Sequence, residues 1–319
     1  MVTHHDETAS AVRPLTLSWV NRHLKTDERI LTTETLHGGI TAEIRKLTIG
    51  ARDGGTRALV LRTFVNAEHA EDSLHREADA LTLLTETAVP APALIAADPT
   101  AAHCEHPSLL MTHLAGRTIL DDEGAEARVP LLARQLAAIH ALRPTERPRT
   151  YTAWTTADTV VTPKGADATT WAAAIDVIRK PPPPYEGRFL HRDFHPGNVL
   201  FAARSPSPAP PRITGVVDWA TTSWGPTDLD VAHCSTNLAL LHGPEWGLRF
   251  AEAYEEAGGT LAATAHARRY WQVRDALAFS EEVASVSQPW RKAGRTELTT
   301  RAVEERLDAY VTTLMTTPT

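Results

Sequence analysis

The chain carries a polar cluster between two apolar runs, and this segment constrains the fold and the chemistry more than any other. Residues 189–201 read FLHRDFHPGNVLF. The apolar ends predict short buried strands, so the polar residues between them lie on a loop that is held at both ends. Asp193 and Asn198 are separated by a Pro-Gly turn, which can bring their side chains to one face. The sequence therefore predicts a rigid functional loop.

A second predicted strand ends directly on a carboxylate. Residues 213–217 read ITGVV, and Asp218 follows them. A carboxylate at the tip of an apolar strand is costly unless it is paired or bound to a cation. Together with Asp193 and Asn198, Asp218 makes an oxygen-rich set of the kind that a hard cation prefers. These three residues are our main candidates for a reactive site.

The pattern His191-x-Asp193-x-x-x-x-Asn198, followed by Asp218, resembles the catalytic loop and metal segment of protein kinases. The fuller segments, HRDFHPGNVLF and GVVDWATTSWGPTDLDVA, are more similar to the aminoglycoside phosphotransferase family. That family commonly has a tryptophan after the metal aspartate and a later Gly-x-x-x-x-Asp segment, whose aspartate is Asp230 here. The resemblance covers residues 36–232, and the helices beyond are generic.

The resemblance implies a role for each polar residue of this segment. Asp193 would accept the proton of a substrate hydroxyl, while Asn198 and Asp218 would hold a magnesium ion that bridges the nucleotide phosphates. His191 is expected to pack under the loop and to hydrogen-bond to the backbone. Asp230 is expected to steady the loop from the next helix.

The first third of the chain predicts a sheet with one prominent helix. Strands are predicted at 30–36, 41–49, 57–65, 93–96 and 108–112, with a hairpin turn at Asp53-Gly54-Gly55. Apolar residues at three- and four-residue spacing predict a helix over 67–87, which a Val-Pro-Ala-Pro run ends. We expect residues 1–112 to form an N-terminal nucleotide-binding lobe, with residues 1–12 as a mobile tail.

The resemblance also implies nucleotide contacts in this lobe. Arg62 would grip the phosphates and Glu77 would pair with it, because Glu77 shares the inward face of its helix with Leu81 and Leu84. Arginine stands here where many kinases have lysine, so its phosphate contact would be bidentate or offset. The remaining expected contacts are the glycines of the phosphate-covering loop and the backbone of the adenine hinge, namely Gly38, Gly39, Thr112 and Leu114.

Residues 113–319 are expected to form a mainly helical C-terminal lobe. Helices are predicted at 127–142, at 169–178 and from 228 to 314. This lobe would contain the catalytic loop (189–201), the metal segment (213–232) and a helical substrate region (233–319). The expected acceptor contacts are one loop histidine and aromatic or acidic residues of the last helices: His195, Trp271, Asp275, Glu281 and Glu282. The alternatives are a core position for the tryptophan and a solvated face for the carboxylates.

Composition argues against several classes of partner. A formal net charge of -7 is unlike that of a phosphate-backbone binder, which presents a basic face. Two cysteines are too few for a disulfide framework. No apolar run approaches the roughly 18 residues that a membrane helix needs. We expect a cytoplasmic monomer or homodimer with no nucleic-acid and no membrane partner.

The expected fold class is α+β, a protein-kinase-like bilobal fold with an antiparallel sheet lobe followed by a helical lobe. The resemblance implies transfer of the γ-phosphate of ATP, or of GTP, with Mg2+, to a hydroxyl of a small molecule. An antibiotic is the favoured acceptor. The alternatives are a metabolic kinase for a sugar, choline, homoserine or nucleoside, a regulatory pseudokinase, and a His/Asp metal hydrolase. The intact Asp193, Asn198 and Asp218 argue against the pseudokinase, and the hydrolase leaves Asn198 unexplained.

Overall fold

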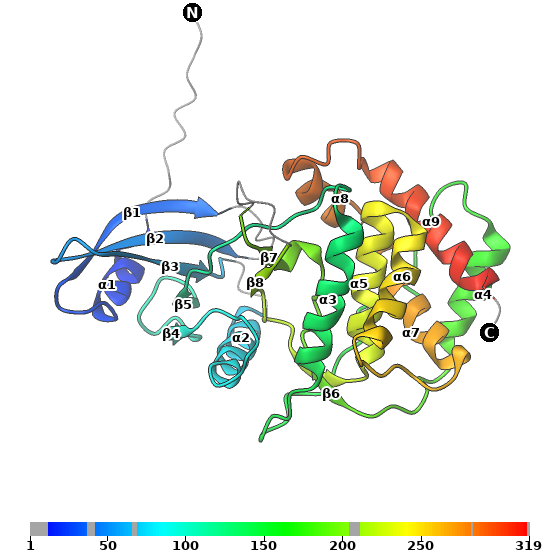
Figure 1. The fold of residues 1–319 in the computed structure, drawn as a ribbon, viewed down its shortest axis with the longest axis horizontal. Coiled ribbons are helices and arrows are strands. Elements are labelled where there is room, and N and C mark those ends of the chain that lie inside the picture. The colour runs from blue at the N-terminus through cyan, green and yellow to red at the C-terminus, as the bar shows by residue number, and fades with distance from the viewer. Residues whose placement is uncertain (1–11, 37–41, 66–68, 204–210, 282, 318–319) are drawn as a thin grey trace, which may run out of the picture. The chain divides into compact units, whose positions relative to one another are not determined.

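The computed structural model describes residues 12–36, 42–65, 69–203, 211–281 and 283–317. The chain divides into two compact units, Met1–Leu114 and Ala115–Thr319. In the described residues, unit 1 carries a sheet with two helices, whereas unit 2 is mainly helical (Figure 1). The α+β class that the sequence predicts is therefore confirmed.

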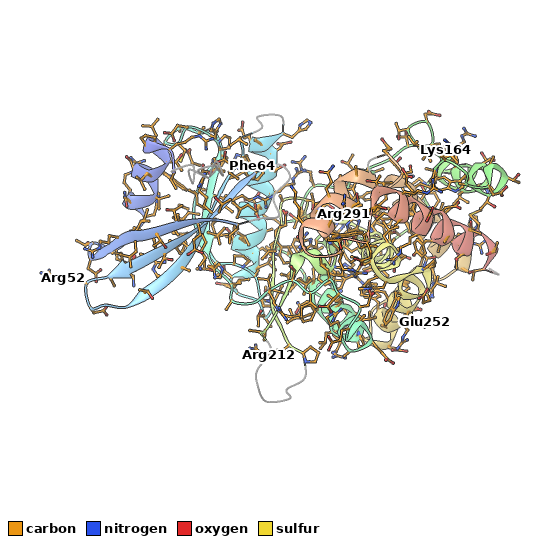
Figure 2. All side chains as sticks on the ribbon, turned by 90° about the horizontal axis from the view of Figure 1, so that it is seen from above. Arg52, Phe64, Lys164, Arg212, Glu252 and Arg291 are labelled. Carbon is orange, nitrogen blue, oxygen red and sulfur yellow. The ribbon has the colours of Figure 1, made fainter. Side chains whose placement is uncertain are left out.

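The described part of unit 1 contains a sheet of five strands, all paired antiparallel. They are β1 (Glu28–Leu36), β2 (Glu43–Ala51), β3 (Thr56–Thr63), β4 (Leu94–Asp98) and β5 (Ser108–Thr112), in the order β1-β2-β3-β5-β4. The predicted turn between β2 and β3 is present, and Gly54 takes a φ of 86° there, which favours glycine. Arg52 lies at the tip of this hairpin (Figure 2).

Two helices pack against this sheet. Helix α1 (Pro14–Arg22) begins with the predicted proline and buries Trp19 and Val20 against Leu47 and Leu59 of the strands. Helix α2 (Ala70–Leu84) contacts β4 and β5. Its buried side chains recur at three- and four-residue spacing, so the inward face predicted from the amphipathic pattern is confirmed.

Helices are the main secondary structure in the described residues of unit 2. They are α3 (Ala125–His140), α4 (Ala168–Arg179), α5 (Thr227–His242), α6 (Pro244–Glu256), α7 (Ala265–Ala278), α8 (Val283–Lys292) and α9 (Thr300–Thr316). Helix α5 lies among α3, α6, α7 and α9 (Figure 1). Every residue of α5 from Asp228 to Leu241 is buried, so its polar side chains face other protein groups rather than solvent. The predicted helical character after residue 228 is confirmed.

Two short two-stranded sheets accompany these helices. One pairs β6 (Arg188–Leu190) with β9 (Ser223–Gly225), and the other pairs β7 (Val199–Phe201) with β8 (Ile213–Val216). The apolar runs that flank the polar cluster therefore form strands, as predicted. Strand β9 was not predicted, because three residues with a glycine give almost no periodic signal.

Candidate active site

The β7–β8 hairpin brings two of the predicted site residues together. Asn198 immediately precedes β7, and Asp218 follows shortly after the end of β8. Val199 is paired with Val216, and the Val217 N–H donates a hydrogen bond of 3.0 Å to the Asn198 carbonyl oxygen. Antiparallel pairing thus places residues that are twenty positions apart in the sequence at one end of a single hairpin.

Asn198 also fixes Asp193. Its Nδ2 group donates to the Asp193 carbonyl oxygen at 2.9 Å and to the Asp193 Oδ2 at 3.0 Å. The intervening residues form a single turn of 3-10 helix, Pro196–Asn198, in which the Gly197 N–H donates to His195 Nδ1 at 3.1 Å. A Cβ atom on Gly197 would lie 2.6 Å from the His195 ring, so the turn requires glycine at this position.

The donor atoms at this end of the hairpin fit a magnesium ion. Both hydrogens of the Asn198 amide are directed at Asp193, which leaves its Oδ1 as the atom for a cation. Asp218 supplies a carboxylate. Mg2+ commonly takes only one or two protein oxygens and completes its octahedron with phosphate and water oxygens. The described residues contain no group of three or more His, Cys, Asp or Glu that could hold a metal ion.

Asp230 holds the start of the catalytic loop from α5. Its Oδ2 accepts from the His191 N–H and its Oδ1 from the Arg192 N–H, both at 2.8 Å. Arg192 has a φ of 71° and Asp218 a φ of 64°, a left-handed conformation that is uncommon outside glycine. Such backbone persists only where the surroundings determine it. The predicted role of Asp230 in steadying the loop is confirmed by these contacts.

His191 is a structural residue of the loop. Its Nδ1 accepts from the Asp193 N–H at 3.2 Å, so its Nε2–H donates to the Val217 carbonyl oxygen at 3.1 Å. The side chain is completely buried, and this burial lowers the pKa of His191, which keeps the ring neutral. The predicted packing of His191 under the loop is confirmed.

His233 of α5, which the sequence analysis did not consider, contacts Asp193 directly. Its Nε2 lies 3.1 Å from Asp193 Oδ1, and its Nδ1 lies 3.1 Å from Asp275 Oδ1 of α7. Burial disfavours the charged ring, but the charge of Asp275 and the hydrogen bonds to both carboxylates raise the pKa of His233 to about 9. An Asp-x-x-His pair in a helix that is polar yet buried is the sequence signal that could have identified it.

Asp193 remains ionised in this surrounding. Burial alone would raise the pKa of Asp193, but the charges of His195 and His233 and the hydrogen bond from His233 hold it well below its ordinary value. Burial lowers the pKa of His195 to about 4, so His233 is the cation beside Asp193 at neutral pH. The Asp193 side chain is still 31% exposed, which leaves it accessible to a substrate hydroxyl.

The structure separates the five residues expected to contact the acceptor. His195 lies beside Asp193, with its Nε2 3.6 Å from Asp193 Oδ1. Glu281 is exposed, and its Oε1 accepts from the hydroxyls of two threonines at 2.8 Å each. Asp275 is buried against His233, and Trp271 is fully buried in the core of unit 2, the alternative that the sequence left open for a tryptophan. Glu282 lies outside the described residues.

Trp154 is an aromatic residue of this region that sequence reasoning missed. It stands in an irregular segment and is 44% exposed. One face of its indole covers the Arg192 guanidinium, 4.1 Å from the ring centroid, and its ring meets the His233 ring edge-on at 5.1 Å. Exposed aromatic surface next to the residues around Asp193 is suited to binding a ring-bearing ligand.

Unit 1 contains the predicted ion pair. Arg62 Nη1 lies 3.0 Å and 2.9 Å from the two carboxylate oxygens of Glu77, and both side chains are buried. The guanidinium also lies 4.9 Å from the ring centroid of Phe64, which is labelled in Figure 2. The expected pairing of Arg62 with Glu77 is confirmed, whereas its contact with phosphates stays a prediction.

The other expected nucleotide contacts of unit 1 are less fully described. The Thr112 N–H donates to the Ala93 carbonyl oxygen, so it is engaged within the sheet. Leu114 is the last residue of unit 1. Gly38 and Gly39 lie outside the described residues. Their predicted roles at the adenine and the phosphates remain predictions.

One known protein family matches residues of both units. The sequence profile of the phosphotransferase enzyme family, abbreviated APH, matches residues 39–277. This match covers most of the chain and includes Arg62, Glu77, Asp193, Asn198 and Asp218. The chain belongs to this family. The resemblance drawn from the catalytic segment is thus confirmed, and the protein is a phosphotransferase of the kinase type that acts on hydroxyl groups.

Solved structures with the same fold are aminoglycoside phosphotransferases. A Ralstonia eutropha protein crystallised as a candidate aminoglycoside phosphotransferase is 16% identical, with a TM-score of 0.60 over 93% of this chain and 97% of that one. A thermostable variant of APH(4)-Ia with ADP and hygromycin B is 18% identical, with a TM-score of 0.56 over 91% and 96%. A GDP complex of an aminoglycoside 2'-phosphotransferase is 18% identical, with a TM-score of 0.55 over 85% and 91%.

These likenesses show the protein-kinase-like fold of the phosphotransferase. Comparison with curated protein sequences gave no significant match. In the part of the chain that the structure describes, no helix is long and apolar enough to span a membrane. The phosphotransferase therefore has an assigned family and fold, and its acceptor has to be inferred from the site.

Proposed function

We propose that this phosphotransferase transfers the γ-phosphoryl group of ATP to a hydroxyl of a small molecule, with Asp193 as the proton acceptor. The observation that carries the proposal is the state of the Asp193 carboxylate. It is ionised, hydrogen-bonded through both oxygens to protein groups, and still 31% exposed. Each carboxylate oxygen can accept more than one hydrogen bond, so a hydroxyl can donate there while Asn198 and His233 keep their contacts.

The chemistry needs little covalent help from the protein. The hydroxyl oxygen bonds to the γ-phosphorus, the bond from that phosphorus to the bridging oxygen breaks, and the nucleoside diphosphate leaves. The hydroxyl proton passes to Asp193. Because positioning and neutralisation of charge dominate such transfers, a rigidly held acceptor carboxylate is what the reaction requires.

We assign the remaining charges to the nucleotide. Asn198 Oδ1 and Asp218 would hold Mg2+, which supplies positive charge to the phosphates when it is bound. Arg62, held by Glu77, would contact the phosphates that are not transferred, and the backbone near Gly38 and Gly39 would cover them. The adenine would be held by backbone groups of Thr112 and Leu114. GTP is the alternative nucleotide, which the GDP complex of one structural neighbour favours.

For the acceptor we favour an antibiotic that carries rings and positive charge. Trp154 offers an exposed aromatic face, and Glu281 offers an exposed carboxylate held by Thr155 and Thr159. An aromatic ring and a carboxylate together suit a cationic ring compound. A structural neighbour was crystallised with the aminoglycoside hygromycin B, which supports this class. A metabolic kinase for a neutral sugar or nucleoside would use the aromatic face without the carboxylate.

A cytoplasmic location fits this function. Cys104 and Cys234 are both buried and free, which suits a reducing compartment. Burial raises the pKa of the Cys104 thiol to about 12, so it is protonated and unreactive. Neither cysteine therefore takes part in the proposed chemistry.

The proposal is tested by a nucleotide-consumption screen of aminoglycosides, other cationic antibiotics, sugars, choline, homoserine and nucleosides. The purified chain is assayed with ATP or GTP and magnesium, and product is confirmed by the mass gained by the acceptor. We expect turnover with a cationic ring compound. Asp193→Ala serves as the control and is expected to lose turnover.

Two results decide between the candidate functions. Turnover with a neutral metabolite alone would move the acceptor assignment to the metabolic alternative. Turnover that is equal in wild type and Asp193→Ala would remove the central role of Asp193.

A further inference from the structure

The hydrogen bonds of His233 join three segments that are far apart in the sequence. Asp193 is in the catalytic loop, His233 is on α5 and Asp275 is on α7. The two ring nitrogens contact one carboxylate each, at 3.1 Å in both cases. An ionised carboxylate can only accept, so each of these contacts requires a proton on the imidazole nitrogen. Two such contacts therefore require the doubly protonated imidazolium.

Aromatic side chains and one amide surround the His233 ring. Phe279 stacks on the ring with centroids 5.4 Å apart, and Trp154 meets it edge-on, so aromatic surface covers it. Asn237, one turn further along α5, donates through Nδ2 to the His233 carbonyl oxygen at 2.9 Å. Its Nδ2 also lies 3.2 Å from Nε2, and since both nitrogens carry hydrogen in the imidazolium, this second contact is not a hydrogen bond in that state. Among these neighbours only Asp193 and Asp275 are anionic. The His195 ring lies 5.9 Å away, and the charge of Arg192 acts on both carboxylates.

Helix α5 thus contacts the loop at two successive turns. Asp230 binds the backbone of His191 and Arg192, and His233, three residues later on the same face, binds the side chain of Asp193. One carboxylate oxygen of Asp193 is held by His233 and the other by Asn198. The carboxylate therefore cannot rotate about its last bond without breaking a charge-assisted hydrogen bond.

We propose that His233 is a positioning residue for Asp193, and that Asp275 holds His233 in its protonated form. The imidazolium fixes Oδ1 of the carboxylate in the position from which Asp193 accepts the hydroxyl proton. This inference rests on the proposed role of Asp193 as proton acceptor. His233 keeps its own proton throughout, since its second nitrogen stays bound to Asp275.

Kinetics of three variants test the proposal with the acceptor found in the screen. His233→Leu is expected to lower kcat about 100-fold and to leave the KM for the nucleotide unchanged, because positioned groups contribute about 10²–10⁴-fold. His233→Gln places an amide N–H near the position of Nε2 and is expected to recover activity to within about tenfold of wild type. In Asp275→Asn the ring loses its anionic partner, so activity is expected to fall as the pH rises above about 7.

His242 provides a matched control on the same helix. Its side chain is also buried, at 3% exposure, and its Nδ1 contacts the carboxylate of Asp122 at 2.5 Å. His242→Leu should disturb the packing of α5 about as much as His233→Leu does. Its kcat should stay near that of wild type. A kcat of His233→Leu equal to that of His242→Leu would overturn the proposal.

Nitrogen NMR supplies a readout that needs no acceptor and no activity. The full chain is labelled at its histidine ring nitrogens, and the His233 signals are assigned by their loss in His233→Gln. Both ring nitrogens are expected to be protonated at pH 8, and one of them to lose its proton in Asp275→Asn. A neutral ring at pH 8 in the wild type would overturn the proposal.

If His233→Leu is too unstable for kinetics, the double variant His233→Leu/Asp275→Leu removes the whole buried pair and is expected to show the same loss of kcat.

The outcomes separate this inference from the proposed function. Activity that is lost in Asp193→Ala but kept in His233→Leu overturns the positioning role alone. Activity that is kept in Asp193→Ala removes the proton-acceptor role, and the positioning role with it.

Discussion

Two buried charge systems stand in the two units of the molecule, and they differ in what their charges are free to do. In unit 1, Arg62 and Glu77 pair across fifteen residues, and the two side chains are 5% and 1% exposed. In unit 2, Asp193, His233 and Asp275 are forty residues or more apart from one another along the chain, and Asp193 is 31% exposed. Both members of the first pair are buried, whereas the second system ends on an accessible carboxylate.

This difference indicates that the Arg62–Glu77 pair stabilises the fold, whereas Asp193 takes part in the reaction. A buried pair with no exposed member mainly avoids the cost of an unpaired charge. A chain of charges with one exposed end orients that end for a partner from solution. We therefore expect substitutions in the first system to lower stability strongly, and substitutions at the reactive end of the second to lower kcat with little change in stability.

The largest effect is expected at Asp218, the proposed metal ligand of unit 2. Asp218→Asn should lower kcat about 1000-fold, because a bound metal ion contributes several kcal/mol of charge stabilisation to the transition state. The melting temperature should stay close to that of wild type. Asp176→Asn, at an exposed aspartate of α4, is the control and should leave both quantities unchanged. A large fall in melting temperature for Asp218→Asn would place Asp218 with the structural charges instead.

A large loss of stability is expected in unit 1. Glu77→Gln leaves the buried Arg62 without its charged partner, which should lower the free energy of unfolding by about 3–5 kcal/mol. The double variant Arg62→Met/Glu77→Leu should recover most of that loss but bind nucleotide poorly. Chemical denaturation and nucleotide titration measure the two quantities. Nucleotide affinity equal to wild type in the double variant would contradict a phosphate-binding role for Arg62.

A smaller effect is expected at the exposed aromatic residue. Trp154→Ala should raise the KM for the acceptor about threefold to tenfold, the size of an aromatic contact of about 0.5–1.5 kcal/mol. Its kcat should change little, since Trp154 contacts Arg192 and His233 rather than Asp193. Val161→Ala, at another exposed apolar residue of unit 2, is the control and should leave the KM unchanged.

A further effect is expected in the pH dependence of stability. The pKa of His233 is raised from 6.5 to about 9 by folding, so its stabilising contribution is present below pH 6.5 and is lost as the pH rises through about 9. The difference in unfolding free energy between wild type and His233→Gln should therefore shrink over that range. A constant difference from pH 6 to pH 9 would mean that His233 does not titrate as the structure indicates.

The sequence predicted the features that depend on local pattern. The apolar runs around the catalytic loop, the Pro-Gly turn and the inward face of Glu77 all follow from spacing within one or two elements. The placement of Asn198 and Asp218 at one end of a hairpin could also be expected. Asn198 immediately precedes one predicted strand, and Asp218 follows the next predicted strand along the chain.

The features that the sequence missed depend on tertiary packing. His233 meets Asp275 because α5 packs against α7. The residue pattern within either helix does not predict which side chains meet across that packing. Trp154 stands in an irregular segment without periodicity. Asp275 was predicted as an acceptor contact, and the structure places it behind His233, buried and one step further from the substrate hydroxyl.

The central claim is that Asp193 accepts the proton of the substrate hydroxyl. The most direct measurement is single-turnover phosphoryl transfer by Asp193→Asn, which keeps the size of the side chain, with saturating nucleotide, magnesium and acceptor. We predict a rate of the chemical step about 10²–10⁴-fold below wild type, with an unchanged Kd for the nucleotide. A rate within threefold of wild type would contradict the account.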